Sequence, residues 1–216
     1  MLREYLRRTG LLLGGLLVSA VGITLMLQAN IGLEPWSVLQ QGMVLTFGMT
    51  FGTASAIVGA AVIAIAFFCG ESFGLGTLAN IFICPVFIDL LLYLGWIPQL
   101  KSFWAGLIAL LGGMELLALG TWMYMKSALG SGPRDALMVV LARRTHRTVG
   151  VCRAAVEVVI VFIGWRLGGQ GTVIAAVGVG SLFNLNFALL RFNPALLHQE
   201  NLPETIRRFC SRKDPA

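Results

Sequence analysis

Two stretches of this chain repeat one another at a constant separation, and this internal repeat constrains the fold more than any other feature. Residues 12–52 align with residues 110–150 without a gap, and eleven pairs of identical residues fall at the offset of 98. Each copy contains a Gly-x-x-Pro-x-x-x-Leu pattern. Further along, Gly76-Thr77 returns as Gly171-Thr172, where the offset has dropped to 95. Eleven matches in one register indicate a duplicated structural unit.

Composition places this duplicated unit in a membrane. The 216 residues are 57% hydrophobic and 12% charged, with a mean hydropathy of +0.82, and so few charges would not cover a soluble domain of this length. A helix needs about 20 residues to cross about 30 Å of hydrocarbon, and its backbone groups are then satisfied internally. We therefore expect an all-α polytopic membrane protein with six spans, at about 9–29, 51–69, 75–97, 103–126, 149–168 and 171–192.

The distribution of lysine and arginine predicts the orientation of these spans. Basic residues precede the first span, follow the fourth and occur in the C-terminal tail, whereas the connection at 30–50 has none. The positive-inside rule then places both termini in the cytoplasm and residues 30–50 outside. The basic connection after the fourth span contains Lys126, Arg134, Arg143, Arg144 and Arg147. Aromatic residues expected at the outer interface are Trp36, Tyr93, Trp96, Trp104 and Trp165.

Three spans in each copy make the second copy enter the membrane upside down, since three is an odd number. The predicted organisation is a first repeat at 1–98, a second, inverted repeat at 99–192 and a cytoplasmic basic tail at 193–216. Inverted repeats of this kind are found in many secondary transporters. The alternative is a six-helix scaffold in which duplication served folding alone.

Each copy also contains a short segment that begins with proline. Pro35 and Pro133 each lie three residues after a glycine, and proline suits the first turn of a helix, where its missing N–H group costs nothing. Ser37 and, in the second copy, Asp135 beside Arg134 take equivalent places in the first turn, where backbone N–H groups and the helix dipole favour an acceptor or anion. The sequence leaves open whether these helices dip into the membrane or lie on its surface.

These segments carry a family resemblance. Residues 32–39 (GLEPWSVL) and 130–137 (GSGPRDAL) resemble the signature segments of the YczE/YyaS/YitT group of bacterial multi-pass membrane proteins, and residues 74–80 (GLGTLAN), with Asp89, resemble its Gly-rich third span. The likeness covers about residues 12–192. It implies a bacterial inner-membrane protein of a largely uncharacterised group, without implying a substrate.

Polar side chains within the spans are the candidate site residues, because charge in hydrocarbon needs a partner or a water-filled cavity. Asp89 and Glu115 have no neighbouring cation in the sequence, and Asp89 is the repeat-mate of Asn184 at the offset of 95. We therefore expect Asp89 and Asn184 to line a central solute or coupling-ion pathway. The other candidates for this pathway are Glu115, Asn80, Arg153 and Glu157.

Several of these residues also have a purely structural interpretation. Arg153 and Glu157 are four residues apart and can pair on one helical face. Asn184 and Asn186 are suited to hydrogen bonds between helices, and the paired glycines at 14–15 and 112–113 to close helix packing.

The leading functional hypothesis is a small secondary transporter or permease of unknown solute, with a proton or Na⁺ as coupling ion. The alternative is a non-transporting regulatory or assembly membrane protein. An enzyme is not expected, because the chain lacks the His-Glu-x-x-His, Gly-x-Ser-x-Gly and Walker A motifs. No cofactor, metal or nucleic acid is expected; the expected partners are the lipid bilayer, a small solute or ion and, given the small size, a second copy in a homodimer.

Overall fold

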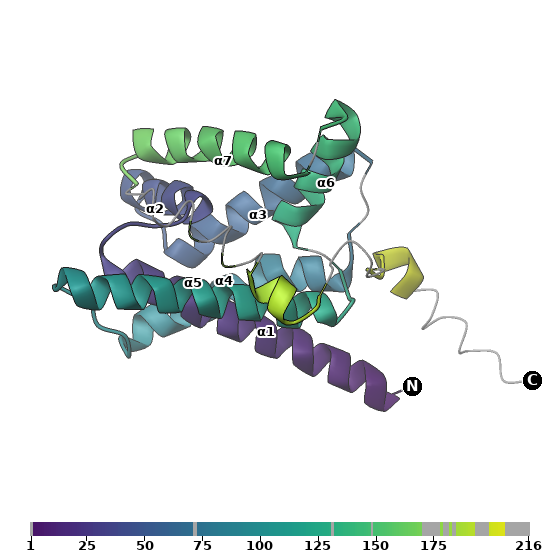
Figure 1. Ribbon diagram of the computed structural model, residues 1–216, viewed down its shortest axis with the longest axis horizontal. Helices are drawn as coiled ribbons and strands as arrows, with labels where there is room; N and C mark the ends of the chain where they lie inside the picture. Colours follow the sequence, from purple (N-terminus) through teal and green to yellow (C-terminus); the bar gives the residue numbers. More distant parts are fainter. Residues whose placement is uncertain are drawn as a thin grey trace, which may run out of the picture.

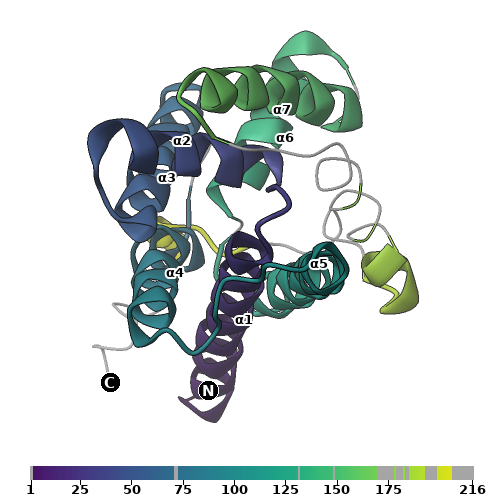
Figure 2. The same ribbon diagram turned by 90° about the vertical axis from the view of Figure 1, so that its left-hand side faces the viewer.

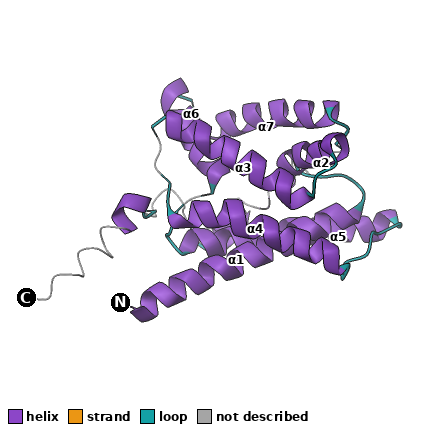
Figure 3. Cartoon of the chain, turned by 180° about the vertical axis from the view of Figure 1, so that it is seen from behind, coloured by secondary structure: helices purple, strands orange, loops and turns teal. Residues whose placement is uncertain are grey.

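The computed structural model describes residues 2–70, 73–130, 132–147, 149–169, 178, 182, 185–192 and 199–205. Within these ranges the chain is helical and forms no strand (Figures 1 and 3). The helices are α1 (Leu2–Ala29), α2 (Pro35–Phe47), α3 (Phe51–Phe68), α4 (Leu75–Leu94), α5 (Phe103–Lys126), α6 (Pro133–Thr145) and α7 (Val149–Arg166).

Four of these helices, α1, α3, α4 and α5, are long and apolar enough to cross a membrane, which agrees with four of the predicted spans. The first helix begins at Leu2 rather than near residue 9, because Arg3, Arg7 and Arg8 continue it beyond its apolar part. The fifth predicted span coincides with the helix α7. This helix holds three charged residues in 18 and is not one of these four helices. Most of the sixth, at 171–192, lies outside the described residues.

The two short helices begin as predicted. Pro35 is the first residue of α2 and Pro133 is the first residue of α6, and both helices have 13 residues. The residues before the prolines, Glu34 and Gly132, have nearly the same extended backbone, with φ and ψ of −70° and 158° against −63° and 154°. Proline itself favours this conformation in the residue that precedes it.

The helices form two groups (Figures 1 and 2). Helices α1, α4 and α5 lie together in one group, while α2, α6 and α7 lie in the other, and α3 contacts α2, α4 and α6 between them. The largest contact joins α1 to α5, and the next joins α2 to α7. The α2–α7 contact corresponds at the offset of 98 to the observed contact of α6 with α3.

Glycines set the close packing of α1 on α5. Gly22 lies against Gly113, and Gly15 against Gly120, so the two helices run antiparallel. A methyl group on Gly22 would come within 2.6 Å of the Gly113 carbonyl oxygen, which only glycine avoids. At the offset of 98, Gly15 corresponds to Gly113 and Gly22 to Gly120, so exchanging the two copies converts one glycine contact into the other.

A second pair of contacts is related in the same way. The Thr46 hydroxyl on α2 donates to the carbonyl oxygen of Leu167, just after α7, at 3.1 Å. Arg144 on α6 donates to the carbonyl oxygen of Cys69, just after α3, at 3.4 Å. The offset of 98 converts Thr46 into Arg144 and Cys69 into Leu167. These two hydrogen bonds are therefore related by the same offset as the two sequence segments.

Candidate functional site

A polar cavity lies where the two groups of helices meet, with about 90 Å³ of free space and with lining residues from each of α1 to α7. Its charged and amide side chains come from the segments that precede or form α2, α4, α6 and α7. They are Glu34, Asn80, Arg134, Arg153 and Glu157. Ser55 from α3 and Thr121 from α5 add hydroxyl groups.

Glu34 is the buried acid of this cavity, with only 3% of its side chain exposed. Its extended backbone turns the carboxylate over the first turn of α2, where it accepts hydrogen bonds from the backbone N–H groups of Trp36, at 3.0 Å, and Ser37, at 3.1 Å. The Ser37 hydroxyl donates to it as well, at 2.9 Å. The positive end of the helix dipole stabilises an anion there. The hydrogen-bond acceptor expected at the start of α2 is therefore the Glu34 carboxylate.

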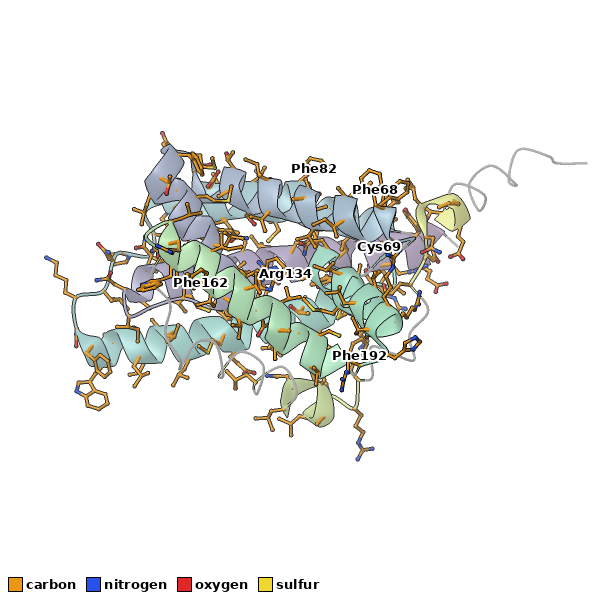
Figure 4. The ribbon with its side chains drawn as sticks, turned by 90° about the horizontal axis from the view of Figure 1, so that it is seen from above. Phe68, Cys69, Phe82, Arg134, Phe162 and Phe192 are labelled. Carbon is orange, nitrogen blue, oxygen red and sulfur yellow. The ribbon has the colours of Figure 1, made fainter. Side chains whose placement is uncertain are left out.

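Arg134 joins this acid to the other copy of the repeat. Its Nη1 atom lies 3.1 Å from Oε1 of Glu34, and its guanidinium stacks 5.0 Å from the centre of the Trp36 ring. Figure 4 shows Arg134 near the middle of the molecule in this view, whereas the labelled Phe68, Phe82 and Phe162 are exposed. The pair connects the first turns of α2 and α6 across the cavity.

One sequence-based expectation is corrected by this arrangement. Trp36, expected at the outer membrane interface, is buried with 4% exposure under the Arg134 guanidinium. Arg134, one of the basic residues of the connection after the fourth predicted span, also lines the cavity. An ion pair with Glu34 and an aromatic face outweigh the preference of arginine for water.

Arg153 and Glu157 form the ion pair that their spacing predicts, with Nε of Arg153 at 2.8 Å from Oε1 of Glu157. Both also line the cavity, opposite the start of α6. The formal charges of Glu34, Arg134, Arg153 and Glu157 cancel. Asp135 follows Arg134 in the first turn of α6, and its side chain lies outside the described part of the structure.

A smaller space of about 20 Å³ adjoins the cavity and shares Trp36, Ser55, Asn80 and Arg134 with it. Gln40, which is 1% exposed, points its amide into this region. Its nitrogen lies 3.3 Å from the Ser55 hydroxyl, whereas its oxygen has no hydrogen-bond partner among the described residues. A buried acceptor without a partner is costly, and it is suited to a bound donor such as water or a solute.

Asp89 is placed elsewhere. Its carboxylate accepts a hydrogen bond from the Thr50 hydroxyl at 2.6 Å and from the Gly52 backbone N–H at 2.7 Å. Thr50 and Gly52 begin α3, so Asp89 on α4 caps the start of the neighbouring helix. Asp89 is not among the described residues that line the central cavity.

Glu115 also lies outside this lining. It accepts a hydrogen bond from the Asn186 amide at 2.9 Å, which ties α5 to residues 185–192. This contact agrees with the structural interpretation of Asn186 as a link between helices. Asn184, the expected partner of Asp89, falls outside the described residues.

The cavity is built from corresponding positions of the two copies. Five pairs of its lining residues are repeat-mates at the offset of 98. The pairs are Ser19/Leu117, Ile23/Thr121, Glu34/Gly132, Trp36/Arg134 and Ser55/Arg153. Sequence reasoning missed Glu34, Trp36, Ser55 and Gln40. A usable signal was present, because the register that pairs Pro35 with Pro133 also pairs Trp36 with Arg134.

Among the described residues, no three His, Cys, Asp or Glu side chains are grouped so that they could hold a metal ion. Cys69, Cys84 and Cys152 are free thiols. The cavity presents hydrogen-bonding and charged groups around a small space, an arrangement suited to binding a small polar molecule.

Most of the chain matches a known protein family and several known proteins. A family model described as "Family of unknown function (DUF6198)" matches residues 6–187. The uncharacterized membrane protein YczE of Bacillus subtilis is 28% identical over 210 residues, which cover 91% of this chain and 97% of that protein. An uncharacterized protein of Haemophilus influenzae is 32% identical over 175 residues, covering 80% of this chain and 79% of that protein.

The uncharacterized protein YyaS of Bacillus subtilis is 26% identical over 173 residues, which cover 79% of this chain and 83% of that protein. No solved structure matches the chain. The resemblance to the YczE and YyaS group is therefore confirmed.

Proposed function

The chain belongs to the DUF6198 family, whose function is unknown, and we propose that it is a small secondary transporter with its solute site in the cavity around Glu34 and Arg134. Its four long apolar helices and its membrane-protein relative support an integral membrane location. We place it in the bacterial inner membrane with both termini in the cytoplasm.

The proposed architecture is six spans in two inverted repeats, at 1–98 and 99–192. The antiparallel packing of α1 on α5 supports it, because a repeat with three spans inverts the first helix of the second copy. The related hydrogen bonds of Thr46 and Arg144 support it at two further interfaces.

One observation carries the transport proposal: a partly buried ion pair at the cavity joins the two repeats. Glu34 belongs to the first repeat and Arg134 to the second, and their 3.1 Å contact borders the free space. Alternating access rocks one repeat against the other around a central site. Such a motion breaks or remakes the Glu34–Arg134 contact, so a solute that competes for either group is coupled to the motion.

The chemistry of the cavity restricts the solute. Charged and hydroxyl side chains line it, and the formal charges of its two described ion pairs cancel. Burying a net charge there is expensive because no uncompensated counter-charge awaits it. We therefore propose a small polar solute without net charge, such as a neutral or zwitterionic molecule.

Uptake into liposomes tests the proposal. Purified full-length protein in liposomes is exposed to a pooled extract of bacterial small molecules, with and without an imposed pH gradient, and the vesicle contents are identified by mass spectrometry. We expect accumulation of at least one polar solute above protein-free vesicles, and loss of that accumulation in Glu34→Gln and Arg134→Gln.

Glu115→Gln is the matched control, since Glu115 is an intramembrane acid outside the cavity lining. Asp89→Asn separates this site from the pathway expected from sequence alone. Well-folded protein that accumulates nothing from the extract favours the regulatory or assembly alternative. Transport that survives Glu34→Gln and is lost in Asp89→Asn would move the site to Asp89.

A further inference from the structure

The last described segment of the chain, residues 199–205, is bound to the connection between α5 and α6. The Gln199 amide nitrogen donates to the carbonyl oxygen of Met125 in the last turn of α5, at 3.2 Å. The amide oxygen of the same side chain accepts a hydrogen bond from the Gly130 backbone N–H at 3.1 Å. Figure 1 shows this segment at the end of the molecule where α1 begins. Gln199 thus attaches the segment to both ends of the turn that leaves α5.

The same segment also reaches the first copy of the repeat. The Arg8 guanidinium of α1 lies 2.6 Å from the Glu200 carboxylate and donates to the Ala128 carbonyl oxygen at 2.8 Å. The Glu200 backbone N–H donates to that same oxygen at 3.0 Å. The Leu202 backbone N–H donates to the carbonyl oxygen of Phe73, just before α4, at 2.9 Å. Residues 199–205 therefore join two elements of the first copy to the α5–α6 connection of the second.

Three stretches of backbone meet beneath this segment, at Gly74. A methyl group there would clash with the carbonyl oxygens of both Leu129 and Glu200, so only glycine allows the approach. The Gly76 backbone N–H donates to the Leu129 carbonyl oxygen at 2.7 Å. The α5–α6 connection is thus seated directly on the start of α4, with Glu200 against the same glycine.

The connection held in this way forms one boundary of the central cavity. Tyr124, before the connection, and Gly132, at its end, both line the cavity. Gly132 leads directly into the first turn of α6, which carries Arg134. A displacement of the connection therefore moves a wall of the cavity and the cation that pairs with Glu34.

The corresponding connection of the first copy has the same backbone form. Asn30 and Ala128 are repeat-mates with φ of 55° and 56°, and Gly32 and Gly130 are repeat-mates with φ of 123° and 134°. Helix α1 ends just before the first connection, and its second turn contacts the other connection through Arg8, so the two lie toward opposite ends of α1. The hydrogen bonds of residues 199–205 fall on the second connection and make two similar turns different in what holds them.

We propose that residues 199–205 are a clasp that closes the central cavity at the α5–α6 connection, and that the cavity opens there when the clasp is released. The clasp binds elements of both copies at this end, so the copies cannot separate there while its hydrogen bonds persist. A motion of one repeat against the other has to break them first. The consequence for transport rests on the proposed function, whereas the opening of the cavity does not.

The reactivity of Cys84 tests the clasp, because this thiol lines the cavity and is 6% exposed. The full chain in detergent, with Cys69→Ser, Cys152→Ser and Cys210→Ser, is treated with N-ethylmaleimide, and modification of Cys84 is followed by mass spectrometry. Glu200→Gln should speed the modification about tenfold, as expected when the loss of a charge-assisted hydrogen bond shifts the closed–open equilibrium. Gln199→Ala should speed it as well, without changing any charge.

Two control variants separate release of the clasp from general loosening. Arg7→Gln removes an exposed charge next to Arg8 and should leave the rate unchanged. Gly42→Ala clashes with the Gly164 carbonyl oxygen at the α2–α7 contact, so it should lower the unfolding temperature without speeding the modification of Cys84. Unchanged rates in Glu200→Gln and Gln199→Ala would refute the clasp, as would an equal acceleration in Gly42→Ala.

Uptake into liposomes distinguishes failure of the clasp from failure of the proposed function. Faster modification of Cys84 in the clasp variants, with no solute accumulated by any variant, would support the clasp and count against transport. Solute uptake by the wild-type chain, with Cys84 equally slow in all variants, would support transport and refute the clasp.

Discussion

The contact between Glu34 and Arg134 predicts a measurable coupling between two residues 100 positions apart. Glu34→Gln leaves the Arg134 guanidinium without its anion, and Arg134→Gln leaves the buried Glu34 carboxylate without its cation. Removing one partner of a fully buried ion pair costs about 3–5 kcal/mol. Because 33% of the Arg134 side chain is exposed, solvent screening lowers the expected loss to about 1–3 kcal/mol for each variant.

The double variant removes both charges, and its loss should fall short of the sum by about 1–2 kcal/mol, since the second substitution no longer breaks an ion pair. Thermal unfolding of the full chain in detergent measures this, at about 2–4 °C for each kcal/mol in a chain of this size. Arg166→Gln is the control, because Arg166 stacks on the exposed Phe162 ring and should change stability by less than about 0.5 kcal/mol. Strictly additive losses would show that the two charges do not interact.

Three further predictions concern the scaffold. Gly22→Ala should destabilise the chain by about 1–3 kcal/mol through a clash with α5. Gly10 has open space around it, so Gly10→Ala should be neutral or stabilising by up to about 1 kcal/mol. The unfolding temperatures of the two variants measure the difference. Asp89→Ala should lower the free energy of unfolding by about 1–2 kcal/mol, because it removes the cap of α3. Asp89→Asn should lower it less, and unfolding by urea or by heat measures both losses. Single cysteines at Leu45 and Thr145, in a cysteine-free background, should react with an impermeant thiol reagent from opposite sides of the membrane; reaction from one side would contradict the inverted repeats.

The spans and the short helices were predictable from sequence because their signals are local. Apolar runs of sufficient length specify α3 and α5 almost to the residue, and Pro35 and Pro133 fix the start of α2 and α6. The close approach of α1 and α5 was also predictable, because glycines repeat along both helices. The N-terminal extension of α1 was not, since charged residues continue a helix into water without an apolar signal.

The site was harder to predict, because it depends on which faces meet in space. Asp89 has the sequence features of a functional acid, yet the start of α3 lies within hydrogen-bonding distance and gives it a structural partner. Glu34 was missed because it lies in a connection predicted to be outside the membrane, where an acid needs no explanation. Only the packing of α2 on α3 and α7 brings its carboxylate to Arg134.

The divergence of the two copies at the cavity has a physical reason. Gly15, Gly22 and their mates are identical in both copies, because each glycine of one helix lies against a glycine of the other and only glycine allows so close an approach. Trp36 and Arg134 are repeat-mates that contact each other, with the Arg134 guanidinium carbon 5.0 Å from the centre of the Trp36 ring. Two arginines there would place like charges in contact, which is unfavourable in a medium of low dielectric constant. A residue that contacts its own mate therefore has to differ from it if either carries a charge.

Repulsion between two like charges at these positions predicts the effect of making the two mates identical. Trp36→Arg should destabilise the chain by about 3–5 kcal/mol, the cost of an uncompensated buried charge, while Trp36→Phe keeps an aromatic face under Arg134 and should lose much less. Adding Arg134→Trp to Trp36→Arg exchanges the two mates and leaves one cation beside one aromatic ring and the Glu34 carboxylate. The exchanged pair should regain at least half of the lost unfolding temperature. If the double variant is as unstable as Trp36→Arg alone, the two positions are not equivalent across the axis and charge repulsion does not explain their divergence.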